Sequence, residues 1–266
     1  MSSFTIKGSR ALVTGATGGI GQAIARALAA EGAELVLSGR RVDVLEPLAN
    51  ELGATSIAAD LSDLDEVERL LAEAGPLDIV VANAALPGTG NVVDYTREQI
   101  ARNLTVNLHA PILMARDSAV GMIERGRGHI VMIGSVSGKV ASNESSMYNA
   151  TKFGLRGFSL AFRQDLAPVG VGLSIVEPGF VGEAGMFVES GGELPKGVRT
   201  VTPAQVARKV VQAIKKDQAE VVVAPIELRA SGAVGSIFPT LSAKLQKLGG
   251  GEKLAKQMVE GQRNKR

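Results

Sequence analysis

Short runs of apolar and β-branched residues alternate along this chain with longer segments that have helical spacing. Seven runs are predicted to be strands: 10–14, 34–38, 54–58, 78–82, 129–133, 171–176 and 220–224. Six segments between them are predicted to be helices: 19–31, 42–52, 64–74, 97–124 (which could be two joined pieces), 146–167 and 203–216. Such alternation produces right-handed βαβ units on a parallel sheet. The sequence therefore predicts an α/β fold with a doubly wound, seven-stranded parallel sheet flanked by helices.

The composition is compatible with one large domain. The chain has 266 residues, enough to bury a substantial core, and its 45% hydrophobic and 21% charged content is typical of a globular protein. Aromatic residues make up only 3%, so aliphatic side chains must fill the core, as in a buried parallel sheet. We expect a domain over residues 1–226, followed by a C-terminal helical extension of the same domain over 227–266.

Several classes of protein are disfavoured by composition. A net charge of +2 is too small to indicate nucleic-acid binding, and the absence of cysteine excludes disulfides, thiolate catalysis and cysteine-ligated metals. No metal site is expected. Residues 1–7 lack the apolar core of a signal peptide, and no apolar run approaches the length of a membrane span. The expectation is a cytoplasmic protein without a transmembrane segment.

A glycine-rich turn joins the first predicted strand to the first predicted helix, in the sequence Thr14-Gly15-Ala16-Thr17-Gly18-Gly19-Ile20-Gly21. Backbone N–H groups and the helix dipole at such a turn attract an anion, and missing Cβ atoms allow a pyrophosphate to approach. Two templates fit, one using Gly15, Gly19 and Gly21, the other Gly15, Gly18 and Gly21. In the first βα turn of a doubly wound pattern, either predicts a dinucleotide site.

The end of the second strand refines the choice of dinucleotide. A site that prefers NAD usually has an acidic residue here to bind the ribose 2′-hydroxyl. This chain has Arg40 and Arg41 instead, after Ser38-Gly39. Arginine suits a phosphate better than a neutral hydroxyl. We therefore expect NADP(H) to be preferred over NAD(H), the alternative being two solvated arginines in a loop.

Tyr148 and Lys152 lie four residues apart, on one face of a predicted helix. An ammonium beside a phenol favours the phenolate, and we expect it to lower the tyrosine pKa from its usual value of about 10. Such a phenol can exchange a proton with a carbonyl or an alcohol near neutral pH. Taken alone, the spacing more often marks a half-buried ring beside a solvated ammonium.

Further motifs accompany this pair in a consistent order along the chain. They are Asp60-Leu61 after the third strand, Asn83-Ala84-Ala85 after the fourth, Asn107 within a helix, Ser135 located 13 residues before Tyr148, and Pro178-Gly179 after the sixth strand. With these motifs, residues 8 to about 225 resemble the short-chain dehydrogenase/reductase family in its compact single-domain branch, which has a Rossmann fold. The order of the motifs is far more specific than any one of them.

The resemblance implies hydride transfer between NADP(H) and a carbonyl or secondary alcohol. It assigns Tyr148 as general acid in reduction and base in oxidation, Lys152 to lower its pKa and bind the nicotinamide ribose, Ser135 to bind the substrate oxygen, and Asn107 to hold a relay water. The cofactor-binding residues implied are Gly15, Thr17, Gly18, Gly19, Ile20, Gly21, Arg40, Arg41, Asp60, Leu61, Asn83, Ala84, Tyr148, Lys152, Pro178, Gly179 and Val181.

Two positions depart from the family pattern. Ala85 replaces the glycine of the usual Asn-Ala-Gly. Glu183 stands where many relatives have a threonine that holds the nicotinamide carboxamide. We therefore expect the carboxamide to be held mainly by backbone near Val181.

Residues 180–200 and the tail are expected to shape the substrate pocket. The first stretch is Gly-rich with little periodicity and is predicted to be a mobile loop. The tail has apolar residues at helical spacing (Val234, Ile237, Phe238, Leu241, Leu245 and Leu248) and a basic end (Lys244, Lys247, Lys253, Lys256, Arg263, Lys265 and Arg266). A helix packed on the domain or on a partner subunit is favoured over a lid or peripheral membrane contact. Pro239 should prevent one continuous helix.

Other functions remain open. A sugar-nucleotide epimerase or dehydratase shares the Tyr-Lys spacing but usually carries a further domain. A non-catalytic NADP-binding regulator would not need Ser135, Tyr148, Lys152 and Asn107 together. The substrate is expected to be a small carbonyl or alcohol compound, with a mild preference for a lipophilic one, although a tail of this length weakly disfavours an acyl-carrier-protein reductase. By resemblance, a homodimer or homotetramer through helices 97–124 and 147–167 is expected.

Overall fold

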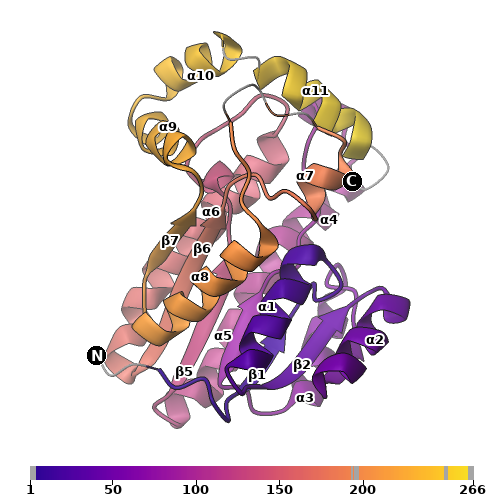
Figure 1. Ribbon diagram of the computed structural model, residues 1–266, viewed down its shortest axis with the longest axis vertical. Coiled ribbons are helices and arrows are strands. Elements are labelled where there is room, and N and C mark those ends of the chain that lie inside the picture. The colour runs from indigo at the N-terminus through magenta and orange to yellow at the C-terminus, as the bar shows by residue number, and fades with distance from the viewer. Residues whose placement is uncertain (1–3, 193, 195–197, 249–250, 263–266) are drawn as a thin grey trace.

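The computed structural model describes residues 4–192, 194, 198–248 and 251–262 (Figure 1). Seven strands form a fully parallel sheet in the order β3-β2-β1-β4-β5-β6-β7, as the alternation predicted. They are β1 (Arg10–Val13), β2 (Glu34–Gly39), β3 (Thr55–Ala58), β4 (Ile79–Ala82), β5 (Gly128–Ile133), β6 (Val171–Pro178) and β7 (Glu220–Val223). The predicted doubly wound fold is confirmed.

Helices cover both faces of this sheet. The α-helices are α1 (Gly19–Ala30), α2 (Val42–Leu52), α3 (Leu64–Ala74), α4 (Arg97–Leu104), α5 (Ala110–Glu124), α6 (Ser146–Leu166), α7 (Met186–Glu189), α8 (Pro203–Lys216), α9 (Ile226–Ile237), α10 (Pro239–Leu248) and α11 (Gly251–Gln262). Single turns of other helix types are η1 (Val92–Asp94), η2 (Thr105–His109), η3 (Val136–Gly138) and η4 (Ala167–Val169).

Two hydrophobic cores lie on opposite faces of the sheet. Val13 of β1 packs in the core beneath α1, α2 and α8, whereas its neighbour Leu12 packs in the core beneath α3, α5 and α6. Successive strand residues point to opposite faces, so a strand covered on both sides must be apolar throughout. Leu12 and Val13 are both fully buried. Burying one such side chain stabilises the fold by roughly 1.5–3 kcal/mol.

The strand order brings the motif-bearing loops to one edge of the sheet. Val13 of β1 pairs with Val81 of β4, and Ile133 of β5 pairs with Val176 of β6. The glycine-rich turn, Asn83, Ser135 and Pro178-Gly179 follow these strands and therefore share the carboxyl edge. Ligands of open α/β sheets bind at this edge, where the strand order reverses between β1 and β4.

The long helix predicted over residues 97–124 is interrupted by η2, a π-helical turn over Thr105–His109. Asn107 lies in this turn and is buried. A π turn is wider than an α turn and frequently occurs at functional sites. The prediction that this segment could be two joined pieces is correct, and the poor helix propensity of asparagine coincides with the break.

The segment after β6 contains more structure than predicted. Helix α7 forms within it, and Val181 pairs with Val201 in an isolated parallel bridge. The stretch 180–200 was predicted to be a mobile loop with little periodicity; this short helix and backbone bridge form within it, and its mobility stays a prediction. Residues 193 and 195–197 of that stretch lie outside the described part of the chain.

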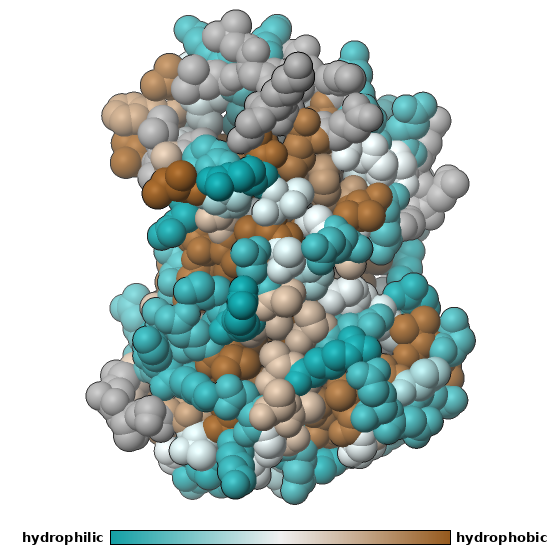
Figure 2. Space-filling model, viewed as in Figure 1, coloured by the Kyte–Doolittle hydropathy of each residue, from teal (hydrophilic) through white to brown (hydrophobic). Residues whose placement is uncertain are grey.

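The tail forms three helices packed on the domain. Pro239 begins α10 and separates it from α9, as predicted. Ser236 Oγ donates to Lys139 O (3.1 Å) and Gln246 Nε2 to Ala141 O (3.0 Å), so α9 and α10 rest on the loop after β5. Ile226, Ile237, Phe238 and Leu241 stay exposed, and brown atoms gather over α9 at the upper left of Figure 2. The structure does not describe four further side chains of the predicted tail pattern, those of Val234, Leu245, Leu248 and Lys253, and it does not describe residues 263–266.

No helix within the described residues is both long and apolar enough to cross a bilayer.

His129, buried in β5, makes the stability of the fold depend on pH. Its buried ring lies 2.9 Å (Nε2) from Ser174 Oγ, and burial lowers its pKa to about 4 from 6.5. Between these pH values the unfolded chain binds a proton that the folded chain does not. The free energy of unfolding should therefore fall by about 3 kcal/mol as pH drops from 6.5 to 4.

Urea unfolding at a series of pH values measures this slope. In His129→Gln, the acid-side slope should be smaller than in the wild type by up to one proton. His109 is exposed and is the only other histidine, so His109→Gln should keep the wild-type slope. Equal slopes in His129→Gln and the wild type would contradict the assignment.

Candidate active site

The turn between β1 and α1 has the geometry of an anion site. Gly15 has a φ of +61°, and a Cβ there would lie 2.8 Å from Ala84 Cα. A Cβ on Gly21 would lie 2.2 Å from Gly15 O. Helix α1 begins with Gly18 as N-cap and no side chain capping its first turn, which leaves backbone donors for an anion.

The two glycine templates can now be distinguished. A Cβ on Gly19 would lie 2.2 Å from Ala184 Cβ, whereas a Cβ on Gly18 would approach no atom closer than 3.5 Å. Steric need therefore favours the template of Gly15, Gly19 and Gly21. The contact between Gly19 and Ala184 also places the segment after β6 directly across the turn. Ile20 is half-buried and packs on the core beneath α1.

Asn83 ties the loop after β4 to the glycine turn. Its Nδ2 donates to Thr14 O (2.9 Å) and Gly15 O (3.1 Å). The backbone N–H groups of Asn83 and Ala84 donate to Thr14 Oγ1 at 3.1 and 3.3 Å. These bonds satisfy carbonyls that the turn leaves outside the sheet ladder. In this structure the asparagine holds the shape of the turn.

The two arginines after β2 lie beside the same turn. Arg41 donates from a terminal guanidinium nitrogen to Thr17 O at 2.5 Å. Arg40 lies 3.5 Å from Asp60 Oδ2, with both side chains about half exposed. Burial acts to raise the pKa of Asp60, but hydrogen bonds from Ser62 and the charge of Arg40 outweigh it, so that pKa lies below its usual range. Leu61 is buried in the core beneath α3.

Tyr148 and Lys152 meet on α6 as predicted, with Lys152 Nζ 5.6 Å from the centroid of the Tyr148 ring. The expected direction of the tyrosine pKa shift is wrong for this structure. Burial raises the pKa of Tyr148, and a hydrogen bond with Ser135 only partly offsets the rise. Lys152 Nζ donates to Ile133 O (2.9 Å), and burial lowers the pKa of this ammonium to about 8.

The physical reason for this difference is burial, which disfavours the charged phenolate. The Lys152 ammonium donates to a strand carbonyl, Ile133 O, and lies 5.6 Å from the centroid of the tyrosine ring. Residue spacing placed the two groups on one face but could not specify this orientation. The phenol therefore stays protonated at neutral pH, as a proton donor requires.

Ser135 is buried at the end of β5 and faces the same site. Its Oγ accepts from Ser137 N–H at 3.1 Å and so begins the turn η3. Asn149, next to Tyr148 on α6, donates from Nδ2 to Ser137 O (2.7 Å) and Val140 O (2.8 Å). This amide fixes the loop that carries the serine. The sequence offered no signal for Asn149 beyond its place beside the tyrosine.

Asn107 reaches the loop after β4. Its Oδ1 accepts from Leu86 N–H at 2.6 Å, and its Nδ2 donates to Leu86 O at 2.8 Å. The side chain thus holds Leu86, three residues beyond Asn83. Because the Asn107 side chain bonds to Leu86, a relay water would instead bind the backbone groups of the π turn. The role of Asn107 in a water relay stays a prediction.

A buried carboxylate lies beneath the loop that carries Ser135. Glu177 of β6 has Oε2 3.0 Å from Lys139 Nζ and Oε1 3.6 Å from Arg156 Nε. Both cations also contact Glu220, at 3.1 and 2.6 Å. Burial raises the pKa of Glu177 to about 7 despite the two cations. The ion pairs of Lys139 with Glu177 and Glu220 therefore attach the loop that carries Ser135 to β6 and β7.

The segment after β6 borders the site from the other side. Gly179 N–H donates to Val223 O (3.0 Å), and Val181 is buried by its bridge to Val201. Glu183 is exposed and has a left-handed φ of +70°. Glu183 is thus a solvent-exposed residue, and the expectation that backbone near Val181 holds the carboxamide stays a prediction.

Comparison with known proteins settles the family. A family model described as short chain dehydrogenase matches residues 9–193. The chain belongs to the short-chain dehydrogenase/reductase family. It is also 36% identical over 250 residues to the ketoacyl reductase HetN of Nostoc sp., which covers 89% of this chain and 87% of that protein.

Solved structures of short-chain dehydrogenases agree with this fold. A short-chain dehydrogenase from Sphingobium yanoikuyae in complex with NADPH matches with a TM-score of 0.75 and 28% identity, over 88% of this chain and 95% of its own. A metagenomic short-chain oxidoreductase in complex with NADP matches with a TM-score of 0.70 and 32% identity, over 83% and 98%. Like its relatives, this dehydrogenase is an oxidoreductase that acts on carbonyl or alcohol groups.

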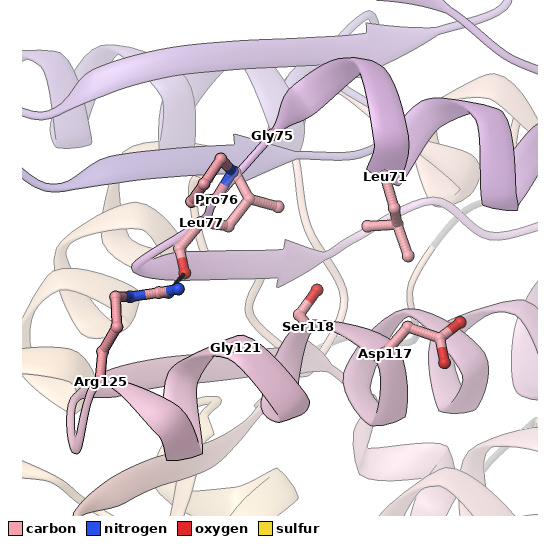
Figure 3. A pocket seen from close by; sticks show the side chains of 8 residues that line it. All are labelled: Leu71, Gly75, Pro76, Leu77, Asp117, Ser118, Gly121 and Arg125. Carbon is pink, nitrogen blue, oxygen red and sulfur yellow. Dashed lines mark hydrogen bonds between the residues drawn. The ribbon is translucent and has the colours of Figure 1, made fainter.

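A hollow elsewhere on this dehydrogenase does not belong to the site. It has a volume of about 130 Å³ and lies between the end of α3 and α5, where Arg125 donates to Leu77 O at 2.6 Å (Figure 3). Pro76 and Leu77 precede β4, so the hollow lies at the amino edge of the sheet. The motif residues all lie at the carboxyl edge.

Proposed function

We propose that this dehydrogenase is an NADPH-dependent reductase of lipophilic ketones. The observation that carries the proposal is the protonated, half-buried phenol of Tyr148, hydrogen-bonded with Ser135 and backed by Lys152. When bound, the nicotinamide supplies a hydride to the carbonyl carbon. Tyr148 Oη gives its proton to the carbonyl oxygen as the C–O double bond becomes a single bond, so charge and protons balance.

The neighbours of Tyr148 have separate roles in this step. Ser135 Oγ–H donates to the substrate oxygen and stabilises the charge that develops there. Lys152 stabilises the tyrosinate left after proton transfer, because a cation nearby favours the charged form of the phenol. Burial favours the neutral phenol in the resting enzyme. Reduction needs a neutral phenol before proton transfer and a stabilised tyrosinate after it, and burial and Lys152 favour these two states in turn.

Cofactor binding rests on the turn, the two arginines and the segment after β6. The uncapped first turn of α1 receives the pyrophosphate, and Arg40 and Arg41 face the 2′-phosphate of NADPH. In the parallel bridge, Gly182 N–H and Phe180 O bond to Val201, so the N–H and C=O of Val181 point the other way. Within the described part of the chain these Val181 backbone groups make no hydrogen bond, which suits them to hold the carboxamide.

Arg40→Ala tests the preference for NADPH. Loss of a guanidinium–phosphate contact should raise the KM for NADPH about tenfold, with less than a twofold change for NADH. Steady-state kinetics with each cofactor at saturating ketone measures both values. Arg208, an exposed arginine of α8, provides the control variant Arg208→Ala, for which neither KM should change. An equal rise of the KM for NADPH and for NADH in Arg40→Ala would contradict a role of Arg40 in selecting NADPH.

The lipophilic substrate is supported by the residues around the segment after β6 and by one relative. Met186 and Phe187 of α7 are half-buried, and Phe187 packs on Phe180 with ring centroids 5.2 Å apart. The alignment with the ketoacyl reductase extends over 250 residues, so a tail of this length is compatible with a ketoacyl substrate. We therefore place acyl thioesters with a 3-keto group first in a panel that includes simple aliphatic and aromatic ketones.

NADPH oxidation across this panel, followed at 340 nm, tests the proposal. A reductase consumes NADPH with at least one ketone, and Tyr148→Phe does not. A non-catalytic NADP-binding regulator would bind NADPH and consume none. An epimerase or dehydratase would turn over a sugar nucleotide without net NADPH oxidation.

We further propose that the enzyme self-associates through the helices α5 and α6. Val120 and Ile123 of α5 and Phe153 of α6 are large apolar side chains that remain exposed on the single chain. Burying such groups in a symmetric interface would remove them from water. Sedimentation equilibrium that returned a monomer at micromolar concentration would contradict this assembly.

A further inference from the structure

Gln262, at the end of α11, has a buried amide with both ends bonded. Its side chain is 1% exposed. Its Oε1 accepts from Thr89 Oγ1 at 2.7 Å, and its Nε2 donates to Met186 O at 2.8 Å. A buried amide is costly to leave unpaired, so these bonds fix the positions of both partners relative to α11.

The two partners belong to segments that follow two different strands, β4 and β6. Thr89 belongs to the loop after β4, and its neighbour Gly88 accepts from Tyr148 N–H through its carbonyl at 3.3 Å. Met186 begins α7, in the segment after β6. In the sheet, β5 lies between β4 and β6, and β5 leads to Ser135. A bridge from Thr89 to Met186 therefore passes over the edge where Ser135 stands.

Helix α11 and the α7 segment are also in direct contact. A Cβ on Gly261 would lie 2.1 Å from Ser190 O, and a Cβ on Gly192 would lie 3.2 Å from Leu254 Cδ1. Leu254 of α11 is buried. On its other side, the segment touches the glycine turn through Ala184 and Gly19. The segment is thus held between the turn and α11.

We propose that Gln262 is a positioning residue that fastens the α7 segment at the sheet edge where Ser135 and Tyr148 lie. It touches neither Tyr148 nor Ser135 through any described hydrogen bond, and acts through Thr89 and Met186. The kinetic consequence rests on the proposed ketone reductase activity. Fastening the segment keeps one side of the site in place for the substrate, so it should affect substrate binding more than proton transfer.

Hydrogen exchange of the free protein tests the fastening without any assumption about catalysis. In Gln262→Leu, which keeps the size but not the polar atoms, amides of residues 186–190 should exchange about tenfold faster than in the wild type. Amides of β1, β4 and β5 should be unchanged. Gln164→Leu, at an exposed position of α6, is the matched control and should show no difference.

Thr89→Val and Gly261→Ala provide independent variants. Thr89→Val removes one donor without changing shape, and Gly261→Ala pushes α11 away from Ser190. Each should accelerate exchange of residues 186–190, and Thr89→Val should add little to Gln262→Leu, because both break the same bridge. Gly232→Ala in α9, where a Cβ meets nothing within 4 Å, should have no effect.

Steady-state kinetics then measures how the loss of this bridge changes the KM for the ketone and kcat. For Gln262→Leu, the KM for the ketone should rise about tenfold while kcat changes less than threefold. Unchanged exchange at 186–190 in both Gln262→Leu and Thr89→Val would overturn the proposal. Faster exchange with an unchanged KM would overturn its kinetic part and leave a purely structural contact. A wild-type enzyme without ketone activity would refute the proposed function while the exchange result still decides the fastening.

Discussion

Replacing Tyr148 with phenylalanine should lower kcat/KM for ketone reduction roughly 10²- to 10⁴-fold, the contribution of a well-placed general acid. The variant removes one oxygen from a ring that keeps its packing on α6. Ser135 and Lys152 would remain in place, but the carbonyl oxygen would have no proton donor of suitable pKa. NADPH affinity should change less than threefold, because the glycine turn and arginines are untouched.

The chain offers a matched control for this change. Tyr95 is the only other tyrosine, and its Oη donates to Thr89 O at 2.7 Å, away from Ser135 and Lys152. Tyr95→Phe removes the same atom and should change kcat less than threefold. Fluorescence titration with NADPH shows whether each variant still binds cofactor. Near-normal turnover by Tyr148→Phe would contradict the assignment of the proton donor.

Gly21→Ala should weaken NADPH binding by about 100-fold or more. Its new Cβ would lie 2.2 Å from Gly15 O and 2.8 Å from Ala16 Cα, and both are backbone atoms. The turn would have to open, which would spread the N–H groups that receive the pyrophosphate. Loss of activity would follow from loss of cofactor rather than from any change at Tyr148.

Gly157→Ala is the control for Gly21→Ala. Gly157 lies within α6, has an ordinary helical φ, and a Cβ there meets nothing within 4 Å. Its affinity for NADPH should equal that of the wild type. Far-UV circular dichroism and the melting temperature check that Gly21→Ala remains folded. A folded Gly21→Ala protein with wild-type affinity would contradict the phosphate-binding role of the turn.

The regular elements could be predicted closely because their signals are local. Helix α3 begins after Asp63, whose carboxylate accepts from Asp65 N–H, and α8 begins with the Thr202–Gln205 capping box and Pro203. Both helices have the predicted bounds. Strand positions differ by at most two residues, and the central strands β4 and β5 are buried on both faces.

The parts that could not be predicted depend on contacts between distant residues. Burial within the fold reversed the expected direction of the Tyr148 pKa shift, and the Lys152 ammonium bonds to Ile133 O. The backbone bridge of Val181 with Val201 ordered a segment that has no side-chain periodicity. Gln262 reaches Thr89 across 173 positions of sequence, and nothing near it in the chain signals that contact.

The candidate site falls between these two cases. Tyr148, Ser135, Lys152 and the glycine turn were predicted by their order along the chain, and the sheet places them at one edge. Asn149 and Asn107 hold the surrounding loops through side-chain bonds to backbone. The sequence indicated Asn107 through its unfavourable propensity, but gave no partner for either.

Transfer of deuterium from NADPH that carries two deuterium atoms at C4 of the nicotinamide tests the central claim most directly. The labelled cofactor is incubated with the 3-ketoacyl thioester and the other ketones, and the products are analysed by mass spectrometry. One deuterium is expected on the carbinol carbon with the wild type, and Tyr148→Phe, which still binds NADPH, should form this labelled product at least about 10²-fold more slowly. Labelled product from Tyr148→Phe at the wild-type rate, or NADPH binding by the wild type without labelled product from any ketone, would contradict it.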